Sequence, residues 1–230
     1  MMSARYIFCV MLLWPISGFS QIGMHFKYVI GQSDQLDAHQ LSQDGIYMAV
    51  EYGFRFKPRR IEFHPALGYR RTFYNDTQDP FATGAKHGYM DALDFDFHTD
   101  LYLFDFEGDC DCPTWSKEGE FFKKGFFLEV SPGLSFQGLT RTFYYSDPGS
   151  PDVPVTSTNL LWKFSLGAGI DIGISEHITI TPILSWTMLS KAEWAGLDEN
   201  GEAGTLDDQT YLAAGFRTTY IMDPKRRGRY

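Results

Sequence analysis

The stretch KFSLGAGIDIGISEHITITPILSW, residues 163–186, alternates apolar and polar side chains almost without interruption. Apolar residues hold the even positions from Phe164 to Ile174, whereas lysine, serine, aspartate and glycine hold the odd ones. Successive side chains of a strand point to opposite faces, so this period of two predicts a β-strand. The alternation breaks at residues 175–177 and resumes at Ile178, which predicts two strands joined by a tight turn.

The apolar face of this hairpin has two candidate environments. In a soluble sandwich it would pack against a second sheet. In a membrane barrel it would contact lipid, while the polar face would line a closed interior. The rest of the chain decides between them.

Eight stretches of the chain show this alternation, and none shows the period of an amphipathic helix. The predicted strands are residues 22–31, 44–56, 60–74, 89–106, 121–139, 157–175, 177–190 and 209–221. They supply the roughly 9–11 residues that a tilted strand needs to cross a bilayer. Pro65, Pro132 and Pro182 fall inside them, and since proline cannot donate to a ladder, we expect bulges or strand ends there.

The connections between the predicted strands alternate in length. The first, third, fifth and seventh are long and rich in Asp, Gly, Pro and Ser; they span residues 32–45, 75–88, 140–156 and 190–208. The second and sixth are tight turns at residues 57–60 and 175–177, and the fourth, residues 107–120, is a long exception. Barrels with both termini in the periplasm place short turns there and long loops outside. The sequence therefore predicts an eight-stranded antiparallel up-and-down transmembrane β-barrel.

Charged residues of both signs fall on the face predicted to be inward. The expected lumenal charge network is Lys27, Glu51, Arg55, Arg70, Asp94, Asp96, His98, Asp100, Glu129, Lys163, Asp171 and Arg217. An eight-stranded barrel is only wide enough to be filled by its own side chains. We therefore expect these charges to pair with one another, which argues against a narrow channel.

The two ends of the chain differ from the barrel in composition. Residues 1–20 combine Arg5, an apolar run and a small-residue cleavage site, which predicts a secretory signal peptide. The barrel is expected over residues 21–222, followed by a basic periplasmic tail at 223–230. This tail is a solvated end or, alternatively, contacts anionic lipid headgroups or a periplasmic partner.

The chain resembles small outer-membrane β-barrel proteins of Gram-negative bacteria. The features that carry the resemblance are the predicted signal peptide, the eight alternating segments, the unequal loop lengths and the last strand TYLAAGFRTTYI (210–221). The resemblance is to the OmpA-transmembrane, OmpX or PorT-like kind. Such barrels commonly end on an aromatic residue at the end of the last strand, but here Tyr230 lies about nine residues beyond it. The resemblance implies location in the cell outer membrane, and its PorT-like form implies a component of a secretion or envelope-assembly machine.

Cys110 and Cys112, in GDCDCPTW (108–115), are the only thiols outside the predicted signal peptide. An oxidising compartment favours a small-ring disulfide that staples the fourth connection. Binding of a soft metal with Asp109 and Asp111, or redox activity, are the alternatives.

The segment LDFDFHTDLYLFDF (93–106) brings Asp94, Asp96, His98 and Asp100 onto one face at strand spacing. This pattern suits a salt-bridge network, with an acid–base or metal site as the sharper alternative. His98 has no identifiable nucleophile beside it, so we expect no enzyme, although a lipid-modifying enzyme at the barrel rim remains an alternative.

The expected function is structural or binding, exerted through the long outer loops and the cysteine-containing turn. The loops carry the aromatic residues Phe143, Tyr144, Tyr145 and Trp194. The formal net charge of -9 argues against nucleic acid. We expect no cofactor and no metal, a monomeric barrel with outer-membrane lipid around it, and an envelope or secretion protein as the candidate partner.

Overall fold

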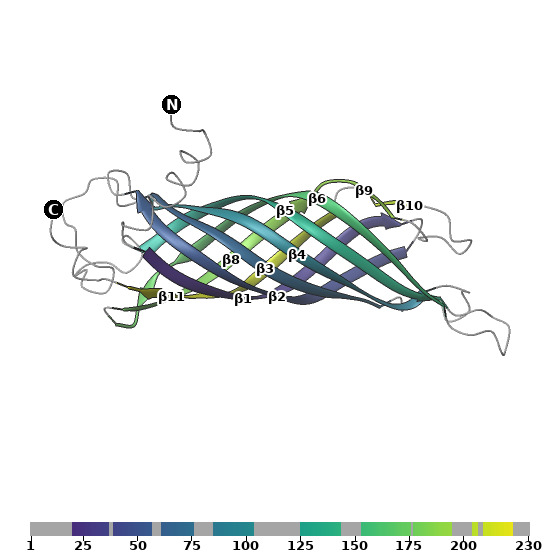
Figure 1. Cartoon of the computed structure of the whole chain (residues 1–230), viewed down its shortest axis with the longest axis horizontal. Coiled ribbons are helices and arrows are strands. Elements are labelled where there is room, and N and C mark those ends of the chain that lie inside the picture. Colours follow the sequence, from purple (N-terminus) through teal and green to yellow (C-terminus); the bar gives the residue numbers. More distant parts are fainter. Residues whose placement is uncertain are drawn as a thin grey trace, which may run out of the picture.

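Eight antiparallel strands form the wall of the molecule in the computed structural model (Figure 1). They are β1 Ser20–Leu36, β2 His39–Phe56, β3 Ile61–Asn75, β4 Ala85–Leu101, β5 Phe126–Phe143, β6 Val153–Ile170, β8 Ile178–Leu189 and β11 Gln209–Ile221. The short β7, Ile172–Gly173, pairs with β8, while β9, Ala192–Trp194, and β10, Gly204–Leu206, form a separate hairpin. The structure describes residues 20–36, 39–56, 61–75, 85–103, 125–143, 153–175, 177–194, 204–206 and 209–222.

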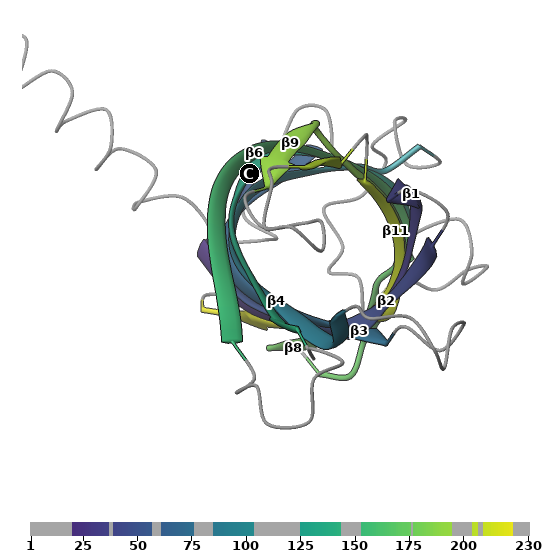
Figure 2. The same cartoon turned by 90° about the vertical axis from the view of Figure 1, so that its right-hand side faces the viewer.

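The first and last strands close the wall into a ring. β1 pairs with β11 from Gln21↔Ile221 to Gln32↔Thr210, and β11 pairs in turn with β8. Figure 2 shows the resulting barrel along its axis. Each of the other neighbours is consecutive along the chain, as in an up-and-down barrel. This closure rules out the two-sheet sandwich.

Apolar side chains cover the outside of this ring, whereas the inside holds most of the polar ones together with a smaller apolar cluster that includes Leu189. Along β8 the exposed positions are isoleucine, proline, leucine, tryptophan and methionine, whereas threonine and serine are buried. Leu160 and Trp162 on β6 are 65% and 74% exposed. In water this would be unfavourable, whereas in a bilayer the same face meets hydrocarbon. The hairpin therefore turns its isoleucine face to lipid, and the fold is a transmembrane β-barrel.

Within the described ranges, no helix is long and apolar enough to span a membrane.

The observed strands are displaced from several predicted bounds. Alternation predicts 89–106, 121–139 and 157–175, but β4, β5 and β6 begin and end nearer the long-loop end. The pattern predicts a strand beyond Leu101 because Tyr102 keeps the inward parity of β4. Its buried hydroxyl donates to Asp171 at 2.6 Å, although the residue lies outside the strand.

The expectation of a long first loop is wrong. β1 and β2 stay paired through Ser33↔Leu41 to Leu36↔His39, with one register shift on the way. Antiparallel pairing persists beyond the bilayer because water can satisfy both faces of the hairpin, so alternation is no longer required. The seventh connection likewise contains the β9–β10 hairpin.

The prolines produce no bulges, contrary to expectation. At Pro65 and Pro132 the ladder omits two residue pairs and resumes in the same register, whereas Pro182 pairs with Phe216. All three prolines lie on the outward parity, where the lipid face has room for their rings.

Two glycines make room for aromatic rings inside the barrel. A Cβ on Gly68 would lie 2.6 Å from the Tyr47 ring, and one on Gly169 would lie 2.5 Å from Phe127 Cζ. Phe127 and Gly169 are direct partners across β5 and β6. Such close contact of ring and backbone requires glycine.

Candidate functional site

The interior of the barrel holds two groups of ion-paired side chains. The lysine cluster consists of Lys163, Asp94, Asp96 and Arg70. The histidine cluster consists of His25, His64, His98, Glu51, Glu62, Asp100, Glu129, Asp171, Lys27 and Arg217. Apart from Asp171, which lies near one end, these residues are buried.

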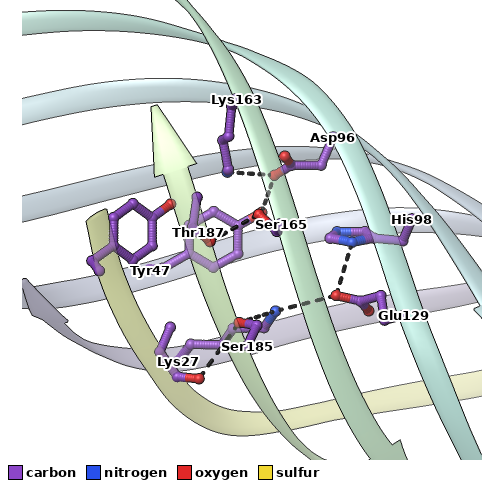
Figure 3. Close-up of a pocket in the computed structure, with 11 residues that line it drawn as sticks. Lys27, Tyr47, Asp96, His98, Glu129, Lys163, Ser165, Ser185 and Thr187 are labelled. Carbon is purple, nitrogen blue, oxygen red and sulfur yellow. Dashed lines mark hydrogen bonds and ion pairs between the residues drawn. The ribbon is translucent and has the colours of Figure 1, made fainter. Parts of the chain in front are cut away.

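Lys163 on β6 is the centre of the lysine cluster (Figure 3). Its Nζ lies 2.8 Å from Oδ2 of Asp94 and 2.8 Å from Oδ2 of Asp96. Arg70 Nε lies 3.4 Å from the same Asp94 oxygen, and the Tyr47 hydroxyl donates to Asp96 at 2.9 Å. Two acids and two bases from three strands thus neutralise one another across the lumen.

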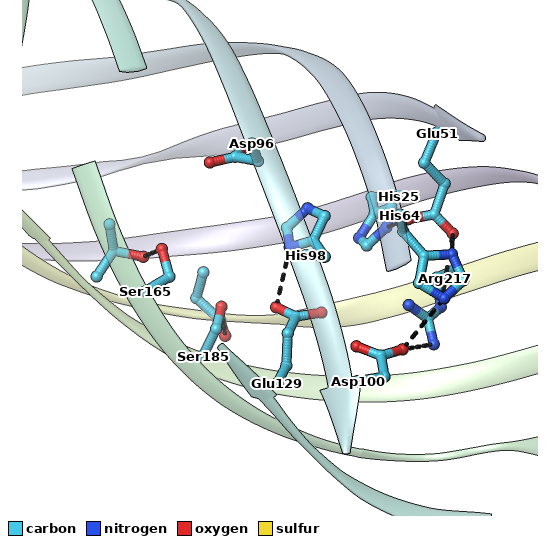
Figure 4. A network of polar contacts seen from close by, with 12 residues as sticks. His25, Glu51, His64, Asp96, His98, Asp100, Glu129, Ser165, Ser185 and Arg217 are labelled. Carbon is cyan, nitrogen blue, oxygen red and sulfur yellow. Dashed lines mark hydrogen bonds and ion pairs between the residues drawn. The ribbon is translucent and has the colours of Figure 1, made fainter. Parts of the chain in front are cut away.

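Glu51 on β2 is the centre of the histidine cluster (Figure 4). Its Oε2 lies 2.6 Å from His25 Nε2, and its Oε1 lies 3.3 Å from His64 Nδ1. Arg217 Nε approaches the latter oxygen at 3.7 Å. One carboxylate therefore joins three basic side chains from three different strands.

Arg217 on β11 carries the network toward the short-turn end. Its Nη2 lies 2.7 Å from Asp100 Oδ2 and 3.7 Å from Asp171 Oδ1. Tyr102 and Thr181 each donate to Asp171 at 2.6 Å. These contacts close the barrel at this level with side chains from β4, β8 and β11, from Tyr102 just after β4, and from the β6–β7 junction.

His98 and Glu129 form a further ion pair within the histidine cluster. His98 Nδ1 lies 3.3 Å from Glu129 Oε1, and Lys27 Nζ lies 3.9 Å from that oxygen. The His98 ring stacks on His25 with centroids 5.1 Å apart. A cavity of about 20 Å³ beside them, also lined by Ser165 and Ser185, has room for a water molecule.

Most residues of the predicted network lie inside the barrel. The structure places Lys27, Glu51, Arg70, Asp94, Asp96, His98, Asp100, Glu129, Lys163, Asp171 and Arg217 in the interior. The side chain of Arg55 lies outside the described residues. The network prediction omits His25 and His64, although both share the inward parity of their strands with Lys27 and Arg70. Extending the parity argument to neutral imidazoles would have found them.

Other predicted features lie outside the described residues. They are residues 1–19, Cys110 and Cys112, Tyr144 and Tyr145, the tail at 223–230, and the side chains of Phe143 and Trp194.

A separate charged group lies on the outer surface between β3 and β4. Arg71 Nε and Nη2 lie 2.6 and 2.8 Å from the two oxygens of Asp91. The Tyr69 hydroxyl donates to Asp91, and the Arg71 guanidinium stacks over the Tyr89 ring at 4.9 Å. Tyrosines beside charge on a lipid-facing wall mark the membrane–water interface.

The closed wall, the lipid-facing apolar surface and the paired interior define a small eight-stranded barrel of the outer-membrane type. No protein-family model matches the chain, and no curated protein matches it.

Three solved structures illustrate what this chain is similar to. A major outer membrane protein from Thermus thermophilus is 9% identical, with 88% of this chain and 99% of that chain covered and a TM-score of 0.48. Neisserial surface protein A is 10% identical, with 86% and 95% covered and a TM-score of 0.46. The outer membrane protease OmpT from Escherichia coli is 9% identical, with 89% and 97% covered and a TM-score of 0.31. The class assignment rests on the geometry above and not on these similarities.

Proposed function

We propose that this chain is a closed, non-catalytic scaffold of the outer membrane that binds a partner through its long loops. The observation that carries the proposal is the ion-paired interior, in which Lys163 and Glu51 each join side chains from several strands. A lumen filled in this way supports a role exerted at the barrel ends and not through a pore.

The long-loop end offers the larger surface for binding. β1, β2, β5 and β6 have 17 or 18 residues each, more than the roughly 9–11 needed to cross a bilayer. Gln21 pairs with Ile221 at one end of the barrel, where the chain enters β1 and leaves β11. The additional residues of the long strands lie at the other end. In our proposal this end faces outward, because small barrels keep termini and short turns in the periplasm.

The predicted processing and cysteine chemistry belong to the same proposal. Residues 1–20 are removed on export, residues 223–230 form the basic periplasmic tail, and Cys110 pairs with Cys112 in the periplasmic turn. Sequencing the N-terminus of the purified membrane protein is expected to begin at Gln21. Thiol titration is expected to rise by two per chain on reduction; an unchanged titre would exclude the disulfide.

Site-specific crosslinking tests the binding role. A photo-crosslinking residue at Tyr145, in the fifth connection, is expected to capture a partner in cells, whereas the same residue at Lys57 is the matched control in a short turn. Capture only from Lys57 would contradict the proposal and favour a periplasmic assembly component. Discrete conductance steps in planar bilayers would contradict the closed scaffold.

A further inference from the structure

We propose that the barrel interior binds one divalent transition-metal ion of the zinc type between His25, Glu51 and His98. Two imidazoles and a carboxylate are a ligand set that Zn²⁺ commonly takes in proteins. This site is independent of the loop-binding role proposed above.

Figure 4 shows the three side chains inside the barrel. Each offers one ligand atom, and these atoms all lie within 4.8 Å of one another. His25 comes from β1, Glu51 from β2 and His98 from β4, so the closed wall brings together residues distant in sequence. All three are at most 4% exposed, which would shield a bound ion from water.

Two buried ring nitrogens without hydrogen-bond partners favour the binding of a ligand at this site. Among the described residues, His25 Nδ1 and His98 Nε2 have no hydrogen-bond partner, although both are buried. A buried polar atom left without a partner is unfavourable, because it has lost its hydrogen bonds to water. Coordination to a metal would satisfy one nitrogen of each ring.

The charge balance of the histidine cluster also favours a cation. Five carboxylates (Glu51, Glu62, Asp100, Glu129 and Asp171) face two permanent cations (Lys27 and Arg217). With the imidazoles of His25, His64 and His98 neutral, the carboxylates exceed these cations by three, and a divalent ion at this position would offset two of the three negative charges. Charges buried together must be compensated, because desolvation is otherwise too costly.

Binding requires the three ligand atoms to converge and the two imidazole rings to reorient. Tetrahedral Zn²⁺ with bonds of about 2.0–2.1 Å holds its ligand atoms about 3.4 Å apart, so the three groups must converge by up to about 1.4 Å. The stacked rings of His25 and His98 must tilt for their lone pairs to meet. The fourth ligand would be Glu129 or a water in the adjoining cavity of about 20 Å³. His64 and Arg217 would hold Glu51 from behind.

Metal analysis of the refolded barrel tests the site. The chain carrying Cys110→Ser and Cys112→Ser, which removes the thiols as ligands, is refolded with Zn²⁺ and then passed through a chelator-equilibrated column. We expect about one zinc per chain. Cobalt substitution is expected to give the visible absorption of a four-coordinate site. A zinc-free folded barrel would overturn the proposal without reference to any variant.

Histidine variants then locate the ion. His98→Ala, and His98→Gln in case the first variant does not fold, are expected to weaken zinc binding at least about tenfold. His177→Ala is the matched control, since His177 is exposed at a turn. Zinc retained by both folded His98 variants, or lost from His177→Ala, would overturn the assignment. Gel electrophoresis of each variant with and without boiling reports folding, because a folded barrel and its unfolded chain migrate differently.

Discussion

Glu51 Oε2 lies 2.6 Å from His25 Nε2, and both side chains are sealed inside the barrel. Glu51 also faces His64 and Arg217, so one carboxylate compensates several basic groups. Removing that single charge leaves the others buried without their partner. The stability of the wall therefore depends on side chains that never contact lipid.

Glu51→Gln is expected to lower the free energy of unfolding by about 3 kcal/mol, because it breaks a buried charge pair while keeping the side-chain shape. Urea unfolding in detergent micelles, followed by tryptophan fluorescence, measures this loss.

Asp91→Asn is the matched control for that substitution. The Arg71–Asp91 pair lies on the outer surface with its two side chains 40% and 34% exposed. Removing one partner of such an exposed pair is expected to lower the free energy of unfolding by much less than Glu51→Gln does. Equal losses for the two variants would show that burial of the Glu51 network does not control stability.

Lys163→Met is expected to destabilise the barrel by about 3 kcal/mol, since Asp94 and Asp96 lose their shared cation. Adding Asp96→Leu is expected to recover at least half of the loss, because Asp94 keeps Arg70 at 3.4 Å. A double-mutant cycle by urea unfolding measures the coupling. A double variant less stable than Lys163→Met alone would contradict the pairing.

Gly169→Ala is expected to cost about 1–3 kcal/mol, because its Cβ would lie 2.5 Å from Phe127 Cζ. Gly138→Ala is the control on a neighbouring strand, where a Cβ meets nothing closer than 3.9 Å. Combining Gly169→Ala with Phe127→Leu should restore part of the stability. If the two alanine variants unfold at the same urea concentration, the ring does not require glycine at this position.

The wall could be predicted from the sequence because lipid and lumen select opposite side chains at every second position. That selection predicts that Lys163 faces the lumen and Leu184 faces lipid. The alternation is lost where strands extend beyond the bilayer, as at the Ser33↔Leu41 pair. Partners inside the lumen could not be predicted, since several carboxylates could reach each base. Only the register of the closed ring brings Glu51 to His25 and Arg217.

Quenching of tryptophan fluorescence by brominated acyl chains tests most directly whether the outer face of the barrel contacts lipid. Trp162 and Trp186 point outward and are 74% and 39% exposed. In vesicles of brominated lipid, their emission is expected to fall strongly relative to ordinary lipid, and Trp162→Phe with Trp186→Phe should remove most of that fall. Emission that is insensitive to brominated chains would contradict the transmembrane barrel.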